Sequence, residues 1–101
     1  MAIAEISVIP LGTKTPSASK HVARAVRVLR EEKNIKYEIT SMGTTIEGEL
    51  DKILMVVKKM HEETFSKEVA RVITVVKIDD RRDKAISMEG KSDSLKRELG
   101  C

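Results

Sequence analysis

Apolar and polar residues alternate along much of the chain in the way that β-strands require. The alternation runs over residues 2–9, 35–41 and 44–49, and residues 71–79 are dense in β-branched side chains. Residues 10–12 contain a proline and a glycine and predict the end of the first segment. The pattern therefore predicts four strands.

Two further segments repeat their apolar residues with the spacing of an α-helix. One begins directly after residue 19 and the other runs over residues 50–64. Ser17 or Ser19 can cap the first helix by accepting a hydrogen bond from a free backbone amide. The residues expected to face the core are Val22, Ala25, Val26 and Leu29 in the first helix and Leu50, Ile53, Leu54, Val57, Met60 and Thr64 in the second.

The order strand, helix, strand, strand, helix, strand predicts an α+β fold of the ferredoxin-like kind. In that fold a four-stranded antiparallel sheet carries two helices on one face. We expect one domain over residues 1–101, in which about residues 91–101 form a tail, and residues 92–99 can form a short helix.

The two faces of the predicted sheet differ in chemistry. The expected helix-covered face carries Ile6, Val8, Ile35, Tyr37, Ile39, Ile46, Val72 and Val76. The opposite face carries Ile3, Ser7, Ile9, Thr40, Thr45, Glu47, Ile73, Val75 and Lys77. An apolar patch with a polar centre usually meets a partner or a ligand. The sequence therefore predicts a homodimer that assembles further into a homotetramer.

Composition narrows the classes of protein to consider. The net charge is +3 and is spread along the chain, so it gives little support for a polyanionic partner. Tyr37 and Phe65 are the only aromatic residues, too few for a sheet that stacks nucleic-acid bases. Asn34 is the only amide side chain, a bias typical of thermophiles.

The single cysteine, Cys101, allows no intrachain disulfide and suits a reducing, cytoplasmic setting. No apolar run is long enough to span a membrane, and the first residues lack the pattern of an export signal. His21 and His61 lie on the two predicted helices without ligands at metal-binding spacing, so we expect surface histidines and no metal. The signs alternate near the last strand, which predicts interchain or terminal salt bridges made by Arg71, Asp79, Arg81 and Asp83, with an anion site as the alternative.

Several short motifs, and the order in which they follow one another along the chain, resemble those of the thiamine-binding protein family of small archaeal, bacterial and fungal proteins. The resemblance covers nearly the whole chain, and its most specific element is TTIEGE at residues 44–49. It implies a ferredoxin-like fold, assembly into dimers and tetramers through the sheets, and binding of thiamine or its hydroxymethylpyrimidine part. The motifs are PLGT at 10–13, SxSxHVA at 17–23, MGTTIEGE at 42–49, RV at 71–72 and KIDDRRD at 77–83.

The stretch SMGTTIEGEL contains the main candidate site residue, Glu47. A carboxylate on a rigid strand can pair with an aminopyrimidine through two parallel, charge-assisted hydrogen bonds. Alternatively, Glu47 forms an ion pair with Lys36, with Lys77 or with an arginine of a second subunit, or it is simply exposed to solvent, as an isolated glutamate usually is. Gly43 and Gly48 allow a close backbone approach.

The other candidate ligand contacts each have a structural explanation as well. Thr44 and Thr45 offer hydroxyl groups, but β-propensity explains them about equally well. Met42 can cover a flat ring with its thioether, although core packing is its commoner role. Ser7, from the neighbouring strand, completes the set.

We find no phosphate loop, no nucleophile motif and no close pairing of a histidine with a carboxylate in the sequence. The chain is therefore expected to bind a small molecule without catalysis and without a cofactor. The alternative is an oligomeric regulatory or assembly module that senses another small metabolite.

Overall fold

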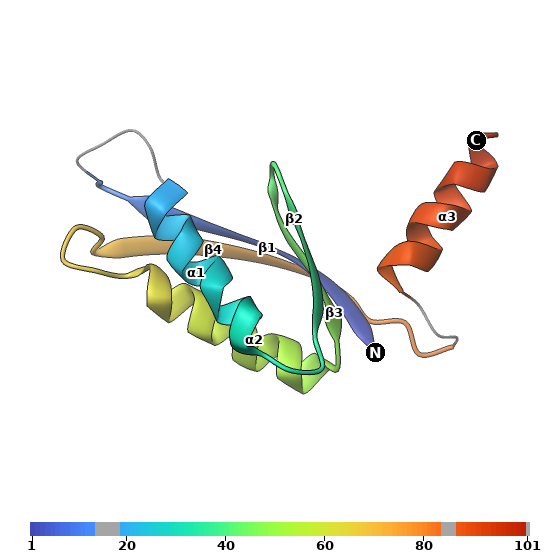
Figure 1. The fold of residues 1–101 in the computed structure, drawn as a ribbon, viewed down its shortest axis with the longest axis horizontal. Coiled ribbons are helices and arrows are strands. Elements are labelled where there is room, and N and C mark those ends of the chain that lie inside the picture. The colour runs from blue at the N-terminus through green and yellow to red at the C-terminus, as the bar shows by residue number, and fades with distance from the viewer. Residues whose placement is uncertain (14–18, 84–86, 101) are drawn as a thin grey trace.

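The computed structural model describes residues 1–13, 19–83 and 87–100, and Figure 1 shows how its elements follow one another. The order confirms the predicted ferredoxin-like α+β arrangement, followed by a C-terminal helix. The elements are β1 (Ala2–Leu11), α1 (Ser19–Glu31), β2 (Lys36–Thr40), β3 (Gly43–Gly48), α2 (Leu50–Thr64), β4 (Arg71–Asp79) and α3 (Met88–Glu98).

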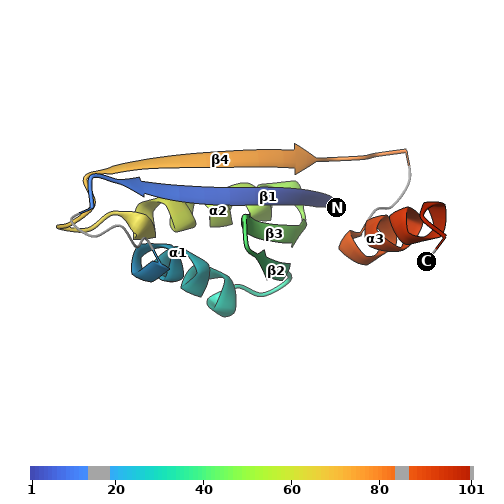
Figure 2. The same ribbon diagram turned by 90° about the horizontal axis from the view of Figure 1, so that it is seen from above.

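The four strands form one antiparallel sheet in the order β2-β3-β1-β4. Figure 2 shows α1 and α2 on the same side of this sheet, and we call the other side the open face. The core lies between the two layers, where alternate residues of β1 meet the inner stripes of both helices. Its fully buried members include Ile6, Leu29, Ile46, Ile53 and Met60.

The predicted assignment of residues to the two faces agrees with the register, but two burial predictions are wrong. Ile39 pairs with Thr44 on the helix side, yet it is 63% exposed because β2 is an edge strand. Leu54 is 49% exposed, and Val56 is buried in its place. The inner stripe of α2 is therefore Ile53, Val56, Met60 and Thr64.

β1 is longer than predicted and continues through Pro10 to Leu11. Pro10 pairs with Val72 of β4, whereas the pairing of β1 with β3 ends at Ile6. Beyond Ile6, β1 has no neighbour on its β3 side, so a residue without an amide hydrogen costs no ladder bond there.

His21 is buried, so the prediction of a surface histidine is wrong for this residue. It lies four residues before Ala25 and therefore on the inner stripe of α1. The guanidinium of Arg24 lies 3.1 Å from His21 Nδ1 and also donates to the carbonyl of Thr64. These contacts join the start of α1 to the end of α2. The predicted cap Ser17 lies outside the described residues.

Glu32 connects the other ends of the two helices. Its carboxylate accepts hydrogen bonds from Lys52 at 2.6 Å and from Lys59 at 2.7 Å, both on α2. The carboxylate side chain is only 11% exposed. The hydrogen bond from Lys52, followed by that from Lys59, lowers the pKa of the Glu32 carboxyl.

α3 begins at Met88, earlier than the predicted residues 92–99. Ser87 precedes it and accepts a hydrogen bond from the amide of Gly90, which is the usual N-cap interaction. None of the described helices is long and apolar enough to cross a membrane.

Replacing Glu32 with glutamine should make the stability of the fold depend less on pH in the acidic range. A carboxyl whose pKa falls on folding stabilises the native state above its unfolded pKa, and this contribution is lost as the pH falls through the folded pKa. The Tm of Glu32→Gln should therefore be lower than wild type at pH 7, and the two should converge below about pH 4.5, the ordinary pKa of glutamate.

Glu31→Gln is the matched control, since Glu31 is exposed and has no ion-pair partner among the described residues. Thermal unfolding followed by circular dichroism from pH 7 to pH 3 measures the effect. An equal loss of Tm at every pH would contradict the assigned ion pairs.

Candidate functional site

The open face of the sheet consists of rows of side chains that the strand register defines. Lys36 of β2, Glu47 of β3 and Ile3 of β1 form one row, which ends at Asp79 of β4. The next row places Thr45 between Glu5 and Glu38, with Lys77 beyond Glu5. Glu47 is thus an interior member of the sheet, with a neighbouring strand on each side.

Glu47 is the most buried acidic residue of the described chain, with 6% of its surface exposed. No hydrogen bond or ion pair to its carboxylate is found among the described residues. Lys77, one of its predicted alternative partners, lies 4.0 Å from Glu5 instead. Lys36 is opposite Glu47 in the register but forms no ion pair with it. The carboxylate oxygens are not among the fully buried, unpartnered atoms of the described chain, so they remain accessible to an external hydrogen-bond donor.

The two threonines of the TTIEGE motif point to opposite faces of the sheet. Thr45 shares the open face with Glu47, because side chains two residues apart on a strand point the same way. Thr44 pairs with Ile6 and Ile39 and is buried on the helix side. The structure therefore brings together Thr45 and Glu47 but not Thr44.

Ser7 and Gly43 meet where β3 begins beside β1. The Ser7 hydroxyl donates a hydrogen bond of 3.0 Å to the carbonyl of Met42. A Cβ atom on Gly43 would lie 2.8 Å from the Ile6 carbonyl oxygen and 2.9 Å from Ser7 Oγ. Gly43 therefore permits the close approach of the two strands, and its role beside a ligand stays a prediction.

Met42 lies in the two-residue connection between β2 and β3 and is 81% exposed. Core packing, the alternative considered for it, is therefore wrong. The Thr40 hydroxyl donates to the carbonyl of Gly43 and accepts from the amide of Met42, which closes the hairpin. Met42 is thus held at the end of the hairpin, with its side chain in solvent.

The charged segment after β4 forms local ion pairs, as predicted for Asp79, Arg81 and Asp83, whereas Arg71 has no ion pair among the described residues. Arg81 donates two hydrogen bonds to Asp83, and this contact raises the pKa of the Arg81 guanidinium. Asp79 pairs with Lys91 of α3. Their partners are already in place, so these groups form no free anion site.

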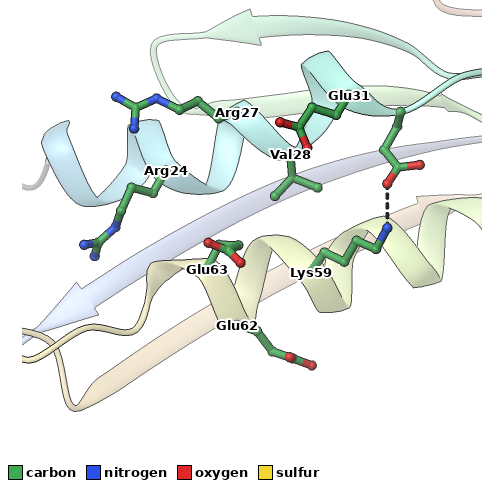
Figure 3. Close-up of a pocket in the computed structure, with 8 residues that line it drawn as sticks. Arg24, Arg27, Val28, Glu31, Lys59, Glu62 and Glu63 are labelled. Atoms are coloured by element: carbon green, nitrogen blue, oxygen red, sulfur yellow. Dashed lines mark hydrogen bonds and ion pairs between the residues drawn. The ribbon is translucent and has the colours of Figure 1, made fainter.

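A groove of about 490 Å³ lies between α1 and α2 on the outer surface. Figure 3 shows Glu62 pointing away from α1 and Arg27 pointing away from α2, so the charges do not converge on one point. No group of three or more acidic, histidine or cysteine residues suited to a metal ion is found among the described residues. The groove is lined by Arg24, Arg27, Val28, Glu31, Glu32, Lys59, Glu62 and Glu63.

The fold and the sites together define a small ferredoxin-like domain with a largely buried glutamate on its open sheet face. Its sequence matches the model of the thiamine-binding protein family over residues 4–96. It is 45% identical to YqgV of Bacillus subtilis (strain 168), with 98% of each chain covered. The chain belongs to the thiamine-binding protein family.

Two further relatives support this membership. A protein of Methanothermobacter thermautotrophicus is 44% identical, with 98% of this chain and 100% of that chain covered. The solved structure of MJ1052 from Methanocaldococcus jannaschii superposes with a TM-score of 0.85 at 39% identity, covering 93% of this chain and 94% of that one. The fold described above is therefore that of a known relative.

Replacing Gly43 with alanine should destabilise the fold. The new methyl group would meet the Ile6 carbonyl and the Ser7 hydroxyl, and the φ of 157° at Gly43 adds backbone strain. We expect a loss of on the order of 1 to 3 kcal/mol in the free energy of unfolding. Chemical denaturation measures this loss.

Gly12→Ala is the control, because Gly12 has a positive φ of 73° but no atom within 4 Å of an added Cβ. The comparison isolates the collision from the backbone strain. Equal losses in the two variants would show that the strand approach at Gly43 is not the limiting contact.

Proposed function

We propose that this protein binds thiamine, or its hydroxymethylpyrimidine part, without catalysis, on the open sheet face at Glu47 and at or near a subunit interface. The observation that carries the proposal is Glu47, a residue that is only 6% exposed and whose carboxylate has no donor among the described residues. The description of the family as thiamine-binding supplies the class of ligand.

An aminopyrimidine has hydrogen-bond donors that suit a carboxylate without a donor in its own chain. Its exocyclic amine and the adjacent ring nitrogen, when protonated, present two donors side by side to the two carboxylate oxygens. Hydrogen bonds of this charge-assisted, bidentate kind are short and about twice as strong as neutral ones. Binding would therefore satisfy Glu47 and orient the ring at the same time.

The neighbours of Glu47 suit the remaining contacts of a flat ring. Thr45 lies on the same face and contributes a hydroxyl group, and Ile3, opposite Glu47 in the register, contributes apolar surface. Ser7 lies further along the open face of β1, and its hydroxyl can accept a hydrogen bond while it donates to Met42. We leave Thr44 out of the proposed site, because its side chain lies on the helix side.

The open face also supports the proposed placement at a subunit interface. Ile9 and Ile73 face each other across β1 and β4 and are 42% and 41% exposed, and Val75 is 54% exposed. In a domain of 101 residues such a patch favours association with a second copy. We propose a dimer through this face and a tetramer beyond it.

The proposal assigns binding and no reaction to the site. Glu47 serves as a hydrogen-bond acceptor for the ligand. His21 and His61 lie on α1 and α2, and therefore on the opposite side of the sheet. His61 already contacts Thr74 through a hydrogen bond of 2.6 Å.

Glu47→Gln should bind thiamine and hydroxymethylpyrimidine more weakly and keep its oligomeric state. The amide preserves the shape of the side chain but removes the negative charge, a loss of about 10-fold to 150-fold in affinity. Isothermal titration calorimetry with each ligand measures the change. Unchanged affinity would remove Glu47 from the site, and dissociation into monomers would show an interchain ion pair instead.

Glu38→Gln is the matched control for this experiment. Glu38 lies on the same face, in the next row and on the edge strand, and is exposed. Its loss should change the affinity by less than about 2-fold, as is usual for an exposed, unpaired charge. If wild type binds neither compound but binds another metabolite, the alternative role as a sensor of that metabolite is favoured.

Val75→Asp should separate the proposed oligomer and lower its Tm. Val75 is half exposed within one chain, so an aspartate there does not disturb the core but places a charge in the proposed interface. Light scattering at micromolar concentration measures the mass. Arg27→Asp, at an exposed position of α1, should change neither quantity. A wild-type monomer at that concentration would refute the proposed assembly.

A further inference from the structure

α3 is tied to β4 by the ion pair of Lys91 with Asp79, but its apolar side chains have little cover in the described chain. Figures 1 and 2 both show it beyond the end of the sheet, away from α1 and α2. No residue of this helix is buried, and the side chains of Leu95 and Leu99 are 61% and 68% exposed. Helices of this length are marginal in water without tertiary packing. A partner for α3 must therefore come from outside the described part of this chain.

The apolar residues near α3 fall on a single stripe. Met88, Ser92, Leu95 and Leu99 are separated by four, three and four residues, which is the spacing of alternating d and a positions in a coiled coil. We call these four residues the α3 seam. Only Ser92 interrupts its apolar character, and a serine is small enough to lie in a helix interface.

We propose that α3 pairs in an antiparallel orientation with α3 of a second copy of this chain, seam against seam. An antiparallel pair of identical helices has twofold symmetry. Met88 of each copy then lies opposite Leu99 of the partner subunit, and Ser92 lies opposite Leu95 of the partner subunit. Two identical α3 helices are therefore complementary to each other in this orientation.

The charges beside the seam select this orientation. Glu89 and Lys96 occupy the positions on one side of the seam, and Lys91 and Glu98 occupy those on the other side. In the antiparallel pair, Glu89 meets Lys96 of the partner subunit, and twofold symmetry gives two such attractive contacts. Lys91 lies beside Glu98 of the partner subunit but already pairs with Asp79 of its own chain.

A parallel pair would have the opposite electrostatics. Flanking residues five positions apart then meet, which brings Lys91 against Lys96 of the partner subunit on both sides. Like charges at such positions oppose association. The distribution of charge on α3 therefore both favours a second copy of the same helix and excludes the parallel register.

The first half of the α3 seam borders a groove beside β2. A groove of about 810 Å³ separates α3 from the edge strand β2 and is bordered by Met88 and Ser92 of the seam. Ile35 and Tyr37 line the opposite wall. Neither Glu89 nor Lys96, which also border the groove, has an ion-pair partner in the described parts of the chain.

Charge reversal in the full-length protein tests the pairing. Lys96→Glu turns two attractive contacts into two repulsive ones and should weaken self-association by about 10-fold. The double variant with Glu89→Lys and Lys96→Glu restores opposite charges across the pair and should recover wild-type association. Sedimentation equilibrium measures the dissociation constants.

Both variants should keep the Tm of the domain, since these side chains are exposed and lie outside the core. Unchanged association in Lys96→Glu would overturn the proposal, as would failure of the double variant to recover. Stronger association in Lys96→Glu would indicate a parallel pair and would also overturn it. Arg97→Glu, on the outer side of α3, is the control and should leave association at the wild-type value.

Discussion

The pairing of β1 with a strand on each side is the constraint on which the remaining structure depends. β1 pairs with β4 from Ile3 to Leu11 and with β3 from Ala2 to Ile6. Because paired residues share a face, the alternation along β1 decides which side chains of its neighbours reach the core. A slip of one residue against β3 would turn Glu47 toward α2 and Ile46 toward solvent. The contact of Gly43 with Ser7 lies at the end of this ladder and opposes such a slip.

This constraint also explains why the open face combines apolar and acidic groups. The two helices cover only one side of the sheet, and a chain of this length has no further layer for the other. Ile9, Ile73 and Val75 then remain accessible on the same surface that carries Glu47. Partner association and ligand binding would therefore draw on one surface, and a ligand bound there would stabilise the assembly by mass action.

The sequence was sufficient for the fold and for the faces, since both follow from local periodicity. The alternation of side chains along β3 correctly placed Glu47 and Thr45 on the open face. The helical spacing in α1 correctly placed Ala25 and Leu29 toward the core. Burial was harder to predict, because it depends on what lies over a residue. Nothing in the periodicity of β2 shows that the helices stop short of Ile39.

For His21, the helical spacing indicated burial, but the polarity of the side chain favoured the opposite prediction. Its position four residues before Ala25 places it on the inner stripe, yet its polarity favoured an exposed site. The burial of Glu47 was missed for a similar reason, since an isolated glutamate is usually solvated. In both cases a polar side chain occupies a position that the periodicity assigns correctly. Exceptions of this kind are expected where a structure serves a function as well as its own stability.

The open face and the α3 seam are two separate surfaces. Each would pair with the same surface on a different copy of the chain. A single twofold interface stops at a dimer, whereas two different twofold interfaces on one chain close into a tetramer when their axes cross at right angles. In such an assembly, ligand bound beside Glu47 would act directly on the sheet interface, whereas the α3 seam contains no residue of the proposed ligand site. The two steps of assembly would then respond differently to ligand, because a ligand stabilises only the state to which it binds more tightly.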